Sequence, residues 1–585
     1  MPATPVLSVV VIAHQSPHLI APVVAAFAGG DAWGCECILI DDGADPEIVK
    51  QCREASRGSV HIRLLRHKVR EGVATCRNSA LRMARGDYVL MADTLAVFDP
   101  AALRARALAA PPKGEVAAQS VPDVVFSTDL LRQVGGWDDT LGDAADTDLL
   151  ARLHGAGVVT PRAVDILFIP HKDYHVWTIS LLRAEMEKQG LTFDIMDITA
   201  QWRDDGVRAM AGAHDLPLVK LSPWVLGHIA PRLVVVFNDW DPITRPLILA
   251  AQAAGMATAG IVEGIQDYAD ADVPWSRQAY QAVDTVLLPG DFDKAYFQQR
   301  RAGQGTAVVG VARIEALRAQ PIDPNRRPAG AGRVLINSNF AYDVLVDERD
   351  AWLTQAVEAV LGAGMEPVVS RHPADKGTLF PQYATEMDFY SCLETCQATI
   401  QRFASGVLES LARDVPVLYF KPRHEKVEKF TADPMGVYPV CETATDLDAA
   451  LANLSAWQEA VDQKAGAFLD HHAGHKGGNV TVSTVTALRA ALGSVPEAQV
   501  LTAFQNLMLG VDRITHAFTK PGGREKALFG TLEQTETVLA KCRKVANLAP
   551  APRRPPALQK PQNNPPRKRG LARIIAGLRR RLLGR

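Results

Sequence analysis

The chain has 585 residues, of which 47% are hydrophobic and 22% are charged, and its formal net charge is −2. At roughly 100–200 residues per domain, this globular composition predicts about three folded units. The sequence contains no run of roughly 20 apolar residues, as a membrane-spanning helix needs, and it does not begin like a signal peptide. Its eight cysteines are scattered, with neither paired zinc motifs nor disulfide-scaffold density. We therefore expect a cytoplasmic chain with reduced thiols.

The first 160 residues show alternating strand-like and helix-like segments. The strand-like runs are Leu7 to His14, Cys37 to Gly43 and Tyr88 to Asp93. They are short and rich in β-branched residues, and the segments between them are long enough for helices. This alternation predicts an α/β fold.

Four motifs in this region carry a family resemblance. In chain order they are SVVVIAH, ILIDDGA (Ile38 to Ala44), GVATCRNSALRMARGDYVLMAD (Gly72 to Asp93) and VGGWDDTLGDAADTDLLARLHGAG (Val134 to Gly157). Together they resemble the family 2 glycosyltransferases, whose GT-A fold binds nucleotide sugars. We therefore expect residues 1–160 to form a GT-A-like domain. The resemblance implies nucleotide-binding roles for Asp41, Asp42, Arg77, Asn78 and Asp93, and the alternative is that these residues only maintain the fold.

The metal and acceptor motifs of this domain are incomplete. Such enzymes hold a divalent cation with an Asp-x-Asp motif, because carboxylate oxygens suit Mg²⁺ and Mn²⁺. Here Asp93 is followed two residues later by Leu95, which cannot ligate a metal. The position of the catalytic base reads Ala145-Asp146, so Asp146 lacks its acidic neighbour. We predict no metal site and metal-independent chemistry, with Mg²⁺ or Mn²⁺ needed only if this domain is active.

A second α/β unit is predicted over residues 161–490. Apolar runs that end in polar or glycine residues recur here, as in buried parallel strands: VDILFIPH, LVVVFND, ATAGIVEG, DTVLLPG, RVLINSNF, MEPVVSRH and DVPVLYFKP. They divide into two Rossmann-like lobes of about 161–320 and 330–490. The segments VVGVARIEAL, SRHPADKG and ATIQRFASGVLESLARDVPVLYFKP resemble the GT-B architecture, and more narrowly the bacterial glycerophosphotransferases and capsule-polysaccharide transferases.

The second lobe carries a candidate site for a nucleotide diphosphate. A helix beginning near Ser405 and Gly406 would present free backbone N–H groups to a phosphate, and Glu409 could accept from ribose hydroxyls. Arg371 and His372 follow a predicted strand and offer positive charge to a leaving diphosphate, with Lys421 as a further candidate cation. The alternatives are ordinary helix capping, a solvated glutamate and a strand-end turn.

The candidate bases lie at strand ends of the first lobe, since ligands of open α/β sheets bind outside the carboxyl ends of strands. They are His171, Asp173, His175, Asp239, Asp241 and Glu263. We favour Glu263 and Asp239 as catalytic residues over the histidines. The alternative for His171 and His175 is a structural role in capping strands or bonding the backbone.

The C-terminal part changes in character. Residues 491–548 have helical apolar spacing, residues 549–569 form a proline-rich linker, and residues 570–585 have the pattern of a basic amphipathic helix. From Ala551 onward the chain has eleven Lys and Arg residues and no acidic residue. This pattern indicates contact with an anionic membrane surface through Arg567 to Arg585. The tail lacks interleaved aromatic residues, so we do not expect nucleic-acid binding.

These features predict a transferase of bacterial surface or capsular polysaccharide biosynthesis, peripheral to the inner face of the plasma membrane. It would move a sugar or a polyol phosphate from a nucleotide-activated donor to a lipid-linked or polysaccharide acceptor, with the GT-B-like unit as the active site. Two alternatives stay open. One is a bifunctional enzyme with an active family 2 domain, and the other is a non-catalytic assembly protein that binds nucleotide or polysaccharide.

The tail generates a test of membrane contact. Deleting residues 567–585 should release the chain from vesicles that contain anionic lipid, because the arginines supply the electrostatic part of the attraction. Activity on a soluble acceptor analogue should stay nearly intact, since the linker separates the tail from the folded units. Co-sedimentation at low salt measures the binding, and equal sedimentation of full-length and shortened chains would contradict the prediction.

Overall fold

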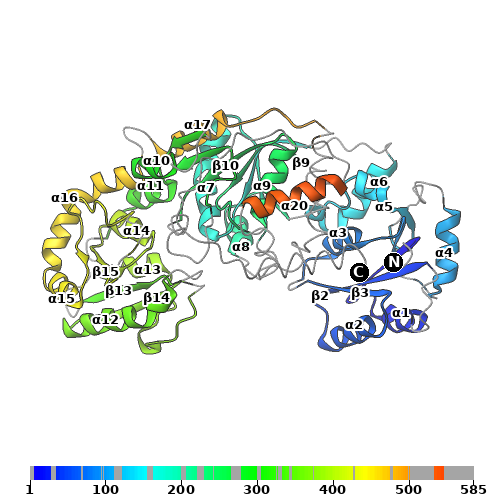
Figure 1. Cartoon of the computed structure of the whole chain (residues 1–585), viewed down its shortest axis with the longest axis horizontal. Coiled ribbons are helices and arrows are strands. Elements are labelled where there is room, and N and C mark those ends of the chain that lie inside the picture. Colours follow the sequence, from blue (N-terminus) through cyan, green and yellow to red (C-terminus); the bar gives the residue numbers. More distant parts are fainter. Residues whose placement is uncertain are drawn as a thin grey trace.

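The computed structural model describes most of the chain outside its C-terminal part. The described residues are 5–27, 34–67, 70–93, 95, 98–110, 121–154, 162–198, 206–220, 229–241, 243–264, 278–298, 305–323, 326, 332–340, 345–372, 375–423, 425, 429–474, 479–497, 500 and 532–545. They form an α/β structure with three separate sheets, which lie in a row in Figure 1. The predicted fold class, a GT-A-like sheet followed by two Rossmann-like lobes, is confirmed.

The N-terminal domain contains a five-stranded sheet in the order β3-β2-β1-β4-β5. Its strands are β1 (Leu7–Ile12), β2 (Cys35–Asp42), β3 (Ile62–His67), β4 (Tyr88–Ala92) and β5 (Val125–Ser127). Its helices are α1 (Ile20–Phe27), α2 (Pro46–Gly58), α3 (Val73–Met83), α4 (Pro100–Ala109), α5 (Thr128–Gln133) and α6 (Ala145–His154), with short 3-10 turns η1 (Pro17–Leu19) and η2 (Asp139–Ala144). Strands β1 and β2 are buried along their whole length, as their continuous apolar runs predict. Only β5 runs antiparallel to its neighbour.

The first lobe of the second unit is built on a parallel seven-stranded sheet in the order β12-β11-β10-β9-β6-β7-β8. The strands are β6 (Arg162–Ile169), β7 (Phe193–Asp197), β8 (Leu218–Lys220), β9 (Ile229–Val236), β10 (Ala257–Ile261), β11 (Thr285–Leu288) and β12 (Gly305–Val308). The helices are α7 (Asp173–Lys188), α8 (Gly206–Ala213), α9 (Thr244–Ala253), α10 (Asp291–Gln298) and α11 (Ala312–Ala319). Because all strands run the same way, their carboxyl ends share one edge, and the candidate bases follow strands at that edge.

The second lobe has a parallel five-stranded sheet in the order β14-β13-β15-β16-β17. The strands are β13 (Arg333–Ser338), β14 (Glu366–Arg371), β15 (Ala398–Gln401), β16 (Val417–Phe420) and β17 (Val440–Cys441). The helices are α12 (Arg349–Gly362), α13 (Phe389–Leu393), α14 (Gly406–Ala412), α15 (Ala444–Ala452) and α16 (Leu454–His472), with 3-10 turns η6 (Val346–Glu348) and η7 (Pro381–Tyr383).

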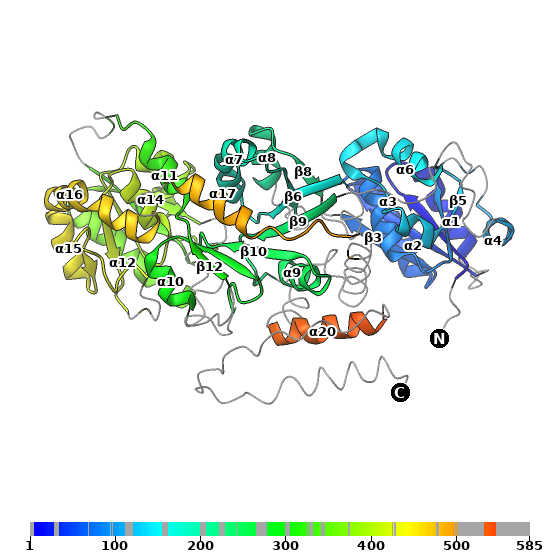
Figure 2. The same ribbon diagram turned by 90° about the horizontal axis from the view of Figure 1, so that it is seen from above.

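After the second lobe the chain returns to the first. Helix α17 (Val480–Ala490) packs against α7, and its Val480, Val485 and Leu488 are buried together with Ile166 and Phe168 of β6. Figure 2 shows α17 lying along the first lobe. The segment 330–490 predicted as the second lobe therefore ends in a helix that belongs structurally to the first.

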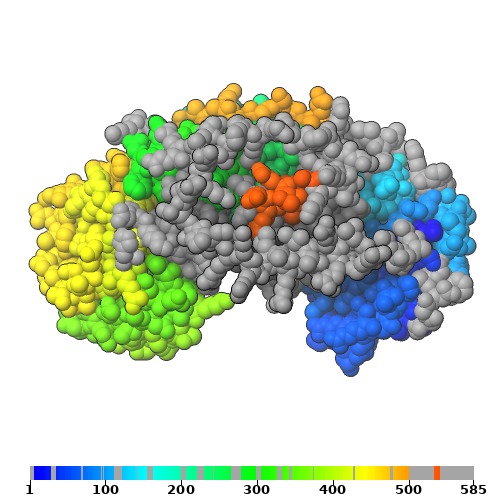
Figure 3. All heavy atoms as spheres, in the orientation of Figure 1, coloured from blue at the N-terminus to red at the C-terminus, as the bar shows by residue number. Residues whose placement is uncertain are grey.

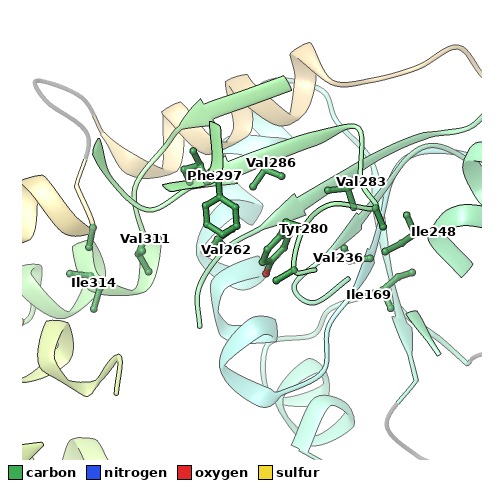
Figure 4. Close-up of a cluster of buried hydrophobic side chains, with 14 of the residues drawn as sticks. Ile169, Val236, Ile248, Val262, Tyr280, Val283, Val286, Phe297, Val311 and Ile314 are labelled. Atoms are coloured by element: carbon green, nitrogen blue, oxygen red, sulfur yellow. The ribbon is translucent and has the colours of Figure 1, made fainter. Parts of the chain in front are cut away.

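A continuous apolar core joins the two lobes. Figure 4 shows its first-lobe side, in which Val262, Tyr280, Phe297, Val311 and Ile314 lie close together. The same cluster continues into the second lobe through Val407, Leu408 and Leu411 of α14. Burial of apolar surface at this boundary stabilises the contact between the lobes by roughly 25 cal/mol for each Å² removed from water.

The last described helix, α20 (Leu532–Val545), packs on α9 of the first lobe. Its Val538 and Leu539 are buried in the same core, and the helix is visible on the front surface in Figure 3. The predicted proline-rich linker and basic tail lie outside the described residues. Within the described part, no helix is both long and apolar enough to cross a membrane.

Gly290 is a position where only glycine fits. It lies at the end of β11, and a Cβ there would stand 2.2 Å from the carbonyl oxygen of His471 in α16. We expect Gly290→Ala to lower the free energy of unfolding by about 1–3 kcal/mol, because two backbones must move apart. Thermal unfolding of the full chain measures this. Gly362→Ala is the matched control, since nothing lies within 4 Å of its Cβ, and an equal effect of both changes would contradict the prediction.

Candidate functional site

Asp42 of the N-terminal domain is already occupied by protein donors. Its carboxylate accepts hydrogen bonds from the backbone N–H groups of Glu71 (2.7 Å) and Gly72 (2.9 Å) and lies 2.8 Å from His67 Nδ1. Burial opposes its ionisation, but these bonds more than compensate and the pKa of Asp42 lies below its ordinary value. The carboxylate therefore fixes the turn that leads into α3.

The neighbouring aspartates also have partners. Asp41 accepts from Arg66 Nε at 2.5 Å and from the N–H of Ala44 at 3.0 Å. Asp93 accepts from Ser16 Oγ at 2.5 Å, which ties the end of β4 to the end of β1. Asp41 is 1% exposed, so its side chain offers little surface to a ligand.

Asp146 and Arg77 are brought together, as their motifs predict, but they bind each other. Arg77 Nη1 donates to Asp146 Oδ1, and Trp137 Nε1 donates to the same oxygen at 2.8 Å. Asn78 is bonded in both directions to the backbone of Trp137. These bonds tie α3 to α6 and occupy Oδ1 of Asp146.

The metal motif of this domain has a hydrophobic replacement. Leu95 is partly buried against the core of α1, β1 and β2, where a metal-binding aspartate would stand in an intact motif. Among the described residues, one other group of possible ligands gathers in this domain, namely Asp42, His67 and Cys76. Its short contacts are hydrogen bonds, because His67 Nδ1 bonds Asp42 and His67 Nε2 lies 3.1 Å from Ser79 Oγ.

A buried charged cluster lies at the boundary between the lobes, around Arg313 of α11. Arg313 Nη1 donates to Glu409 Oε1 of α14 and lies 3.1 Å from Tyr390 Oη of α13. Its Nη2 lies 3.8 Å from Glu263 Oε2, which follows β10. The guanidinium also sits over the Tyr174 ring of α7, 5.2 Å from the centroid. One cation thus joins two carboxylates from opposite lobes.

The surroundings of Glu263 suit a general base. Thr178 Oγ1 donates to Glu263 Oε1 at 2.6 Å, whereas Oε2 has no hydrogen-bond partner among the described residues. Burial raises the pKa of Glu263, and Arg313 and Thr178 partly offset this rise. Its side chain is only 1% exposed.

Both carboxylate oxygens of Asp239 are bonded to the backbone, unlike those of a general base. Its two oxygens accept from the backbone N–H groups of Tyr280 (2.5 Å) and Ala282 (2.8 Å), and the residue is fully buried. Asp241 likewise accepts from the N–H groups of Ile243 and Thr244 at the start of α9. Burial raises the pKa of Asp241 to about 6 against these bonds. Both aspartates therefore shape loops, which does not favour the base role predicted for Asp239.

The candidate histidines of the first lobe are buried and neutral. Burial lowers the pKa of His171 to about 3, and its Nε2 lies 2.7 Å from Thr244 Oγ1. His175 Nδ1 accepts from the N–H of His171, and the ring stacks on Phe237. This is the structural alternative that the sequence left open. Asp173 is exposed at the start of α7.

The Ser-Gly turn begins a helix at the predicted place, but its glycine has a packing reason. A Cβ on Gly406 would lie 2.5 Å from Gln401 Oε1 and 2.9 Å from Phe389. Ser405 makes no side-chain cap, and α14 has only seven residues. Glu409 points to Arg313 rather than standing solvated.

Arg371 and His372 lie together at the end of β14, as predicted. Arg371 Nη2 donates to the carbonyl of Leu379, while its buried Nη1 has no hydrogen-bond partner among the described residues. Burial lowers the pKa of His372, and Lys172 of the first lobe lowers it further. Lys172 therefore acts on His372 across the lobe boundary, and the lowered pKa favours the neutral form of the His372 ring.

Lys421 stands apart from this pair. It follows β16, its Nζ lies 3.6 Å from Glu442 Oε1, and its backbone N–H donates to Cys441. Arg313 and Tyr390 were not predicted as site residues. The only signal in the sequence was the position of Arg313 within VVGVARIEAL, a segment that carried the resemblance without a residue role.

Comparisons with known proteins agree with the motifs of the first domain. Residues 8–130 match the family model of glycosyl transferase family 2. No curated protein matches the chain. Among solved structures, a TarS fragment of S. aureus is 17% identical with a TM-score of 0.22, covering 25% of this chain and 54% of the fragment. The chain thus spans about half the length of that structure.

Two further structures overlap a larger part of the chain. The wall teichoic acid polymerase TagF, soaked with CDPG, is 12% identical with a TM-score of 0.35, over 56% of this chain and 88% of its own. The spinosyn rhamnosyltransferase SpnG, complexed with thymidine diphosphate, is 13% identical with a TM-score of 0.35, over 56% of this chain and 100% of its own. At these values the likenesses assign no activity. The similarity to glycosyl transferase family 2 is that of the segment of residues 8–130.

Proposed function

We propose that the chain is a transferase of bacterial surface-polysaccharide biosynthesis whose active site lies between the two lobes of its second unit. It moves a sugar or a polyol phosphate from a nucleotide-activated donor to a hydroxyl of a lipid-linked or polysaccharide acceptor. The observation that carries this proposal is Glu263, a buried carboxylate at the lobe boundary with one oxygen free of hydrogen bonds among the described residues, 3.8 Å from Arg313 Nη2.

The reaction assigns a role to each part of this boundary. Glu263 takes the proton from the acceptor hydroxyl, and the oxygen forms a bond to the transferred group. The bond from that group to the nucleotide breaks, and its electron pair leaves on the nucleotide phosphate. Arg371, with one free N–H-bearing nitrogen among the described residues, and His372 stabilise this developing charge. Ser405, Gly406, Glu409 and Lys421 remain proposed contacts of the nucleotide.

The N-terminal domain supports this assignment by contrast. Its Asp42 and Asp146 bond to groups of the same domain, and Leu95 occupies the metal position. We propose that this domain binds an acceptor or serves as a scaffold. A bifunctional enzyme would need these contacts to rearrange around a donor. The proposed place of the chain is the inner membrane surface, reached through the basic tail.

The base can be tested directly. Glu263→Gln should reduce turnover about 10²- to 10⁴-fold, because the amide cannot accept the acceptor's proton. The measurement is steady-state transfer from nucleotide sugars and CDP-glycerol. Asp93→Asn is the matched carboxylate control in the first domain and should keep most of the activity, since Asp93 lacks a second metal-binding carboxylate. The opposite pattern would move the active site to the first domain.

The second test concerns metals. Transfer should persist after treatment with EDTA, because Leu95 replaces one half of the metal motif and Arg371 can meet the phosphate charge instead. The assay compares rates before chelation, after chelation and after addition of Mn²⁺. Complete loss with EDTA and recovery with Mn²⁺ would refute metal-independent transfer.

A further inference from the structure

Arg313 occupies an unusual place in the second unit. It stands in the first turn of α11, the helix that leaves the first lobe, and it is 3% exposed. Its partners come from four other elements: Glu263 after β10, Tyr174 of α7, Tyr390 of α13 and Glu409 of α14. These partners come from both lobes, so Arg313 connects the two lobes.

The cluster contains one guanidinium and two carboxylates, so its charges do not balance. Glu263 and Glu409 each bring a carboxylate to a different nitrogen of the same guanidinium. Only Glu409 is at contact distance, and Glu263 stands at 3.8 Å. Since the opposite charge is shared, Glu409 competes with Glu263 for Arg313. The state of one carboxylate therefore affects the other.

We propose that Arg313 is a positioning residue that holds Glu263 ready as the base of the interlobe site and couples it to Glu409 of the second lobe. This inference rests on the base proposed above. When the lobes separate, Glu409 withdraws from Arg313 and the guanidinium serves Glu263 alone. The site therefore opens at the same time as Arg313 becomes available to Glu263 alone.

The groups that face Glu263 define the pH dependence of this device. Arg313 of α11, Thr178 of α7 and Tyr390 of α13 act on Glu263 directly. Arg313 in turn contacts Tyr174 of α7 and Glu409 of α14 and acts on His175 of α7, while Asp173 at the start of α7 acts on Tyr390. His175 is neutral, because burial first and then His171 and Arg313 hold its pKa far below its ordinary value. Tyr390 is neutral at working pH, since burial raises its pKa. Arg313 is therefore the charge that acts on Glu263 directly, and Glu409 acts on Glu263 through Arg313.

Two substitutions break the same contact with opposite electrostatic effects. Arg313→Met removes the positive charge and should raise the pKa of Glu263, whereas Glu409→Gln removes the competing negative charge and should lower it, each by about 1 pH unit. A base works when deprotonated, so activity falls as pH falls through its pKa. The acid limb of kcat/KM should therefore move to higher pH in Arg313→Met and to lower pH in Glu409→Gln.

The experiment measures the protonation of Glu263 with and without turnover, in the full chain. Infrared difference titration follows the protonated carboxyl band that Glu263→Gln abolishes, and it needs no substrate. Arg318→Met, on the same helix and also paired across to α16 through Asp470 at 2.8 Å, is the matched control and should leave the band unchanged. If Arg313→Met does not fold, Glu409→Gln still decides, because it keeps Arg313 beside Glu263.

The outcomes separate this inference from the proposed function. Opposite shifts of the infrared band support the positioning role. Shifts in the same direction, or none, overturn it, because a merely structural contact would disturb both variants alike. Opposite shifts together with full turnover by Glu263→Gln would reject Glu263 as the base while leaving its coupling to Arg313 established.

Discussion

The second unit depends on how one guanidinium is shared between two lobes. Burying an arginine is tolerable only when its charge is met, and removing one partner of a buried pair costs about 3–5 kcal/mol. Arg313 meets Glu409 from one lobe and Glu263 from the other. The same helix also fixes α17 to the first lobe, since Glu315 accepts from the N–H of Val480 at 3.0 Å. The start of α11 is thus where the lobes are held in register.

Carboxylates at strand ends are hydrogen-bonded differently in the two halves of the chain. In the N-terminal domain, Asp42 accepts from two backbone N–H groups and lies 2.8 Å from His67 Nδ1, so both of its oxygens are bonded inside the fold. In the second unit, Glu263 has a single short bond, from Thr178, and a second oxygen with none among the described residues. A carboxylate that is fully bonded stabilises a loop, and one that is only half bonded can still accept a proton.

The sequence was informative where a local pattern determines the structure. Buried strands such as β1 and β2 have continuous apolar runs, and the residues at their ends could be placed at one sheet edge. It was less informative where distant segments meet. Arg313 and Glu409 are 96 positions apart, and nothing near either residue marks the pairing. Asp239 looked like a base because its strand-end position does not reveal that Tyr280 and Ala282 donate to it.

The return of α17 to the first lobe has a consequence for how this unit can be divided. The first lobe is made of two separate stretches of chain, and Val480 and Leu488 cover apolar residues of β6 that would otherwise face water. A fragment cut between the lobes would expose that surface and be prone to aggregate. The two lobes therefore form one indivisible module, which recombination can exchange as a whole but not lobe by lobe.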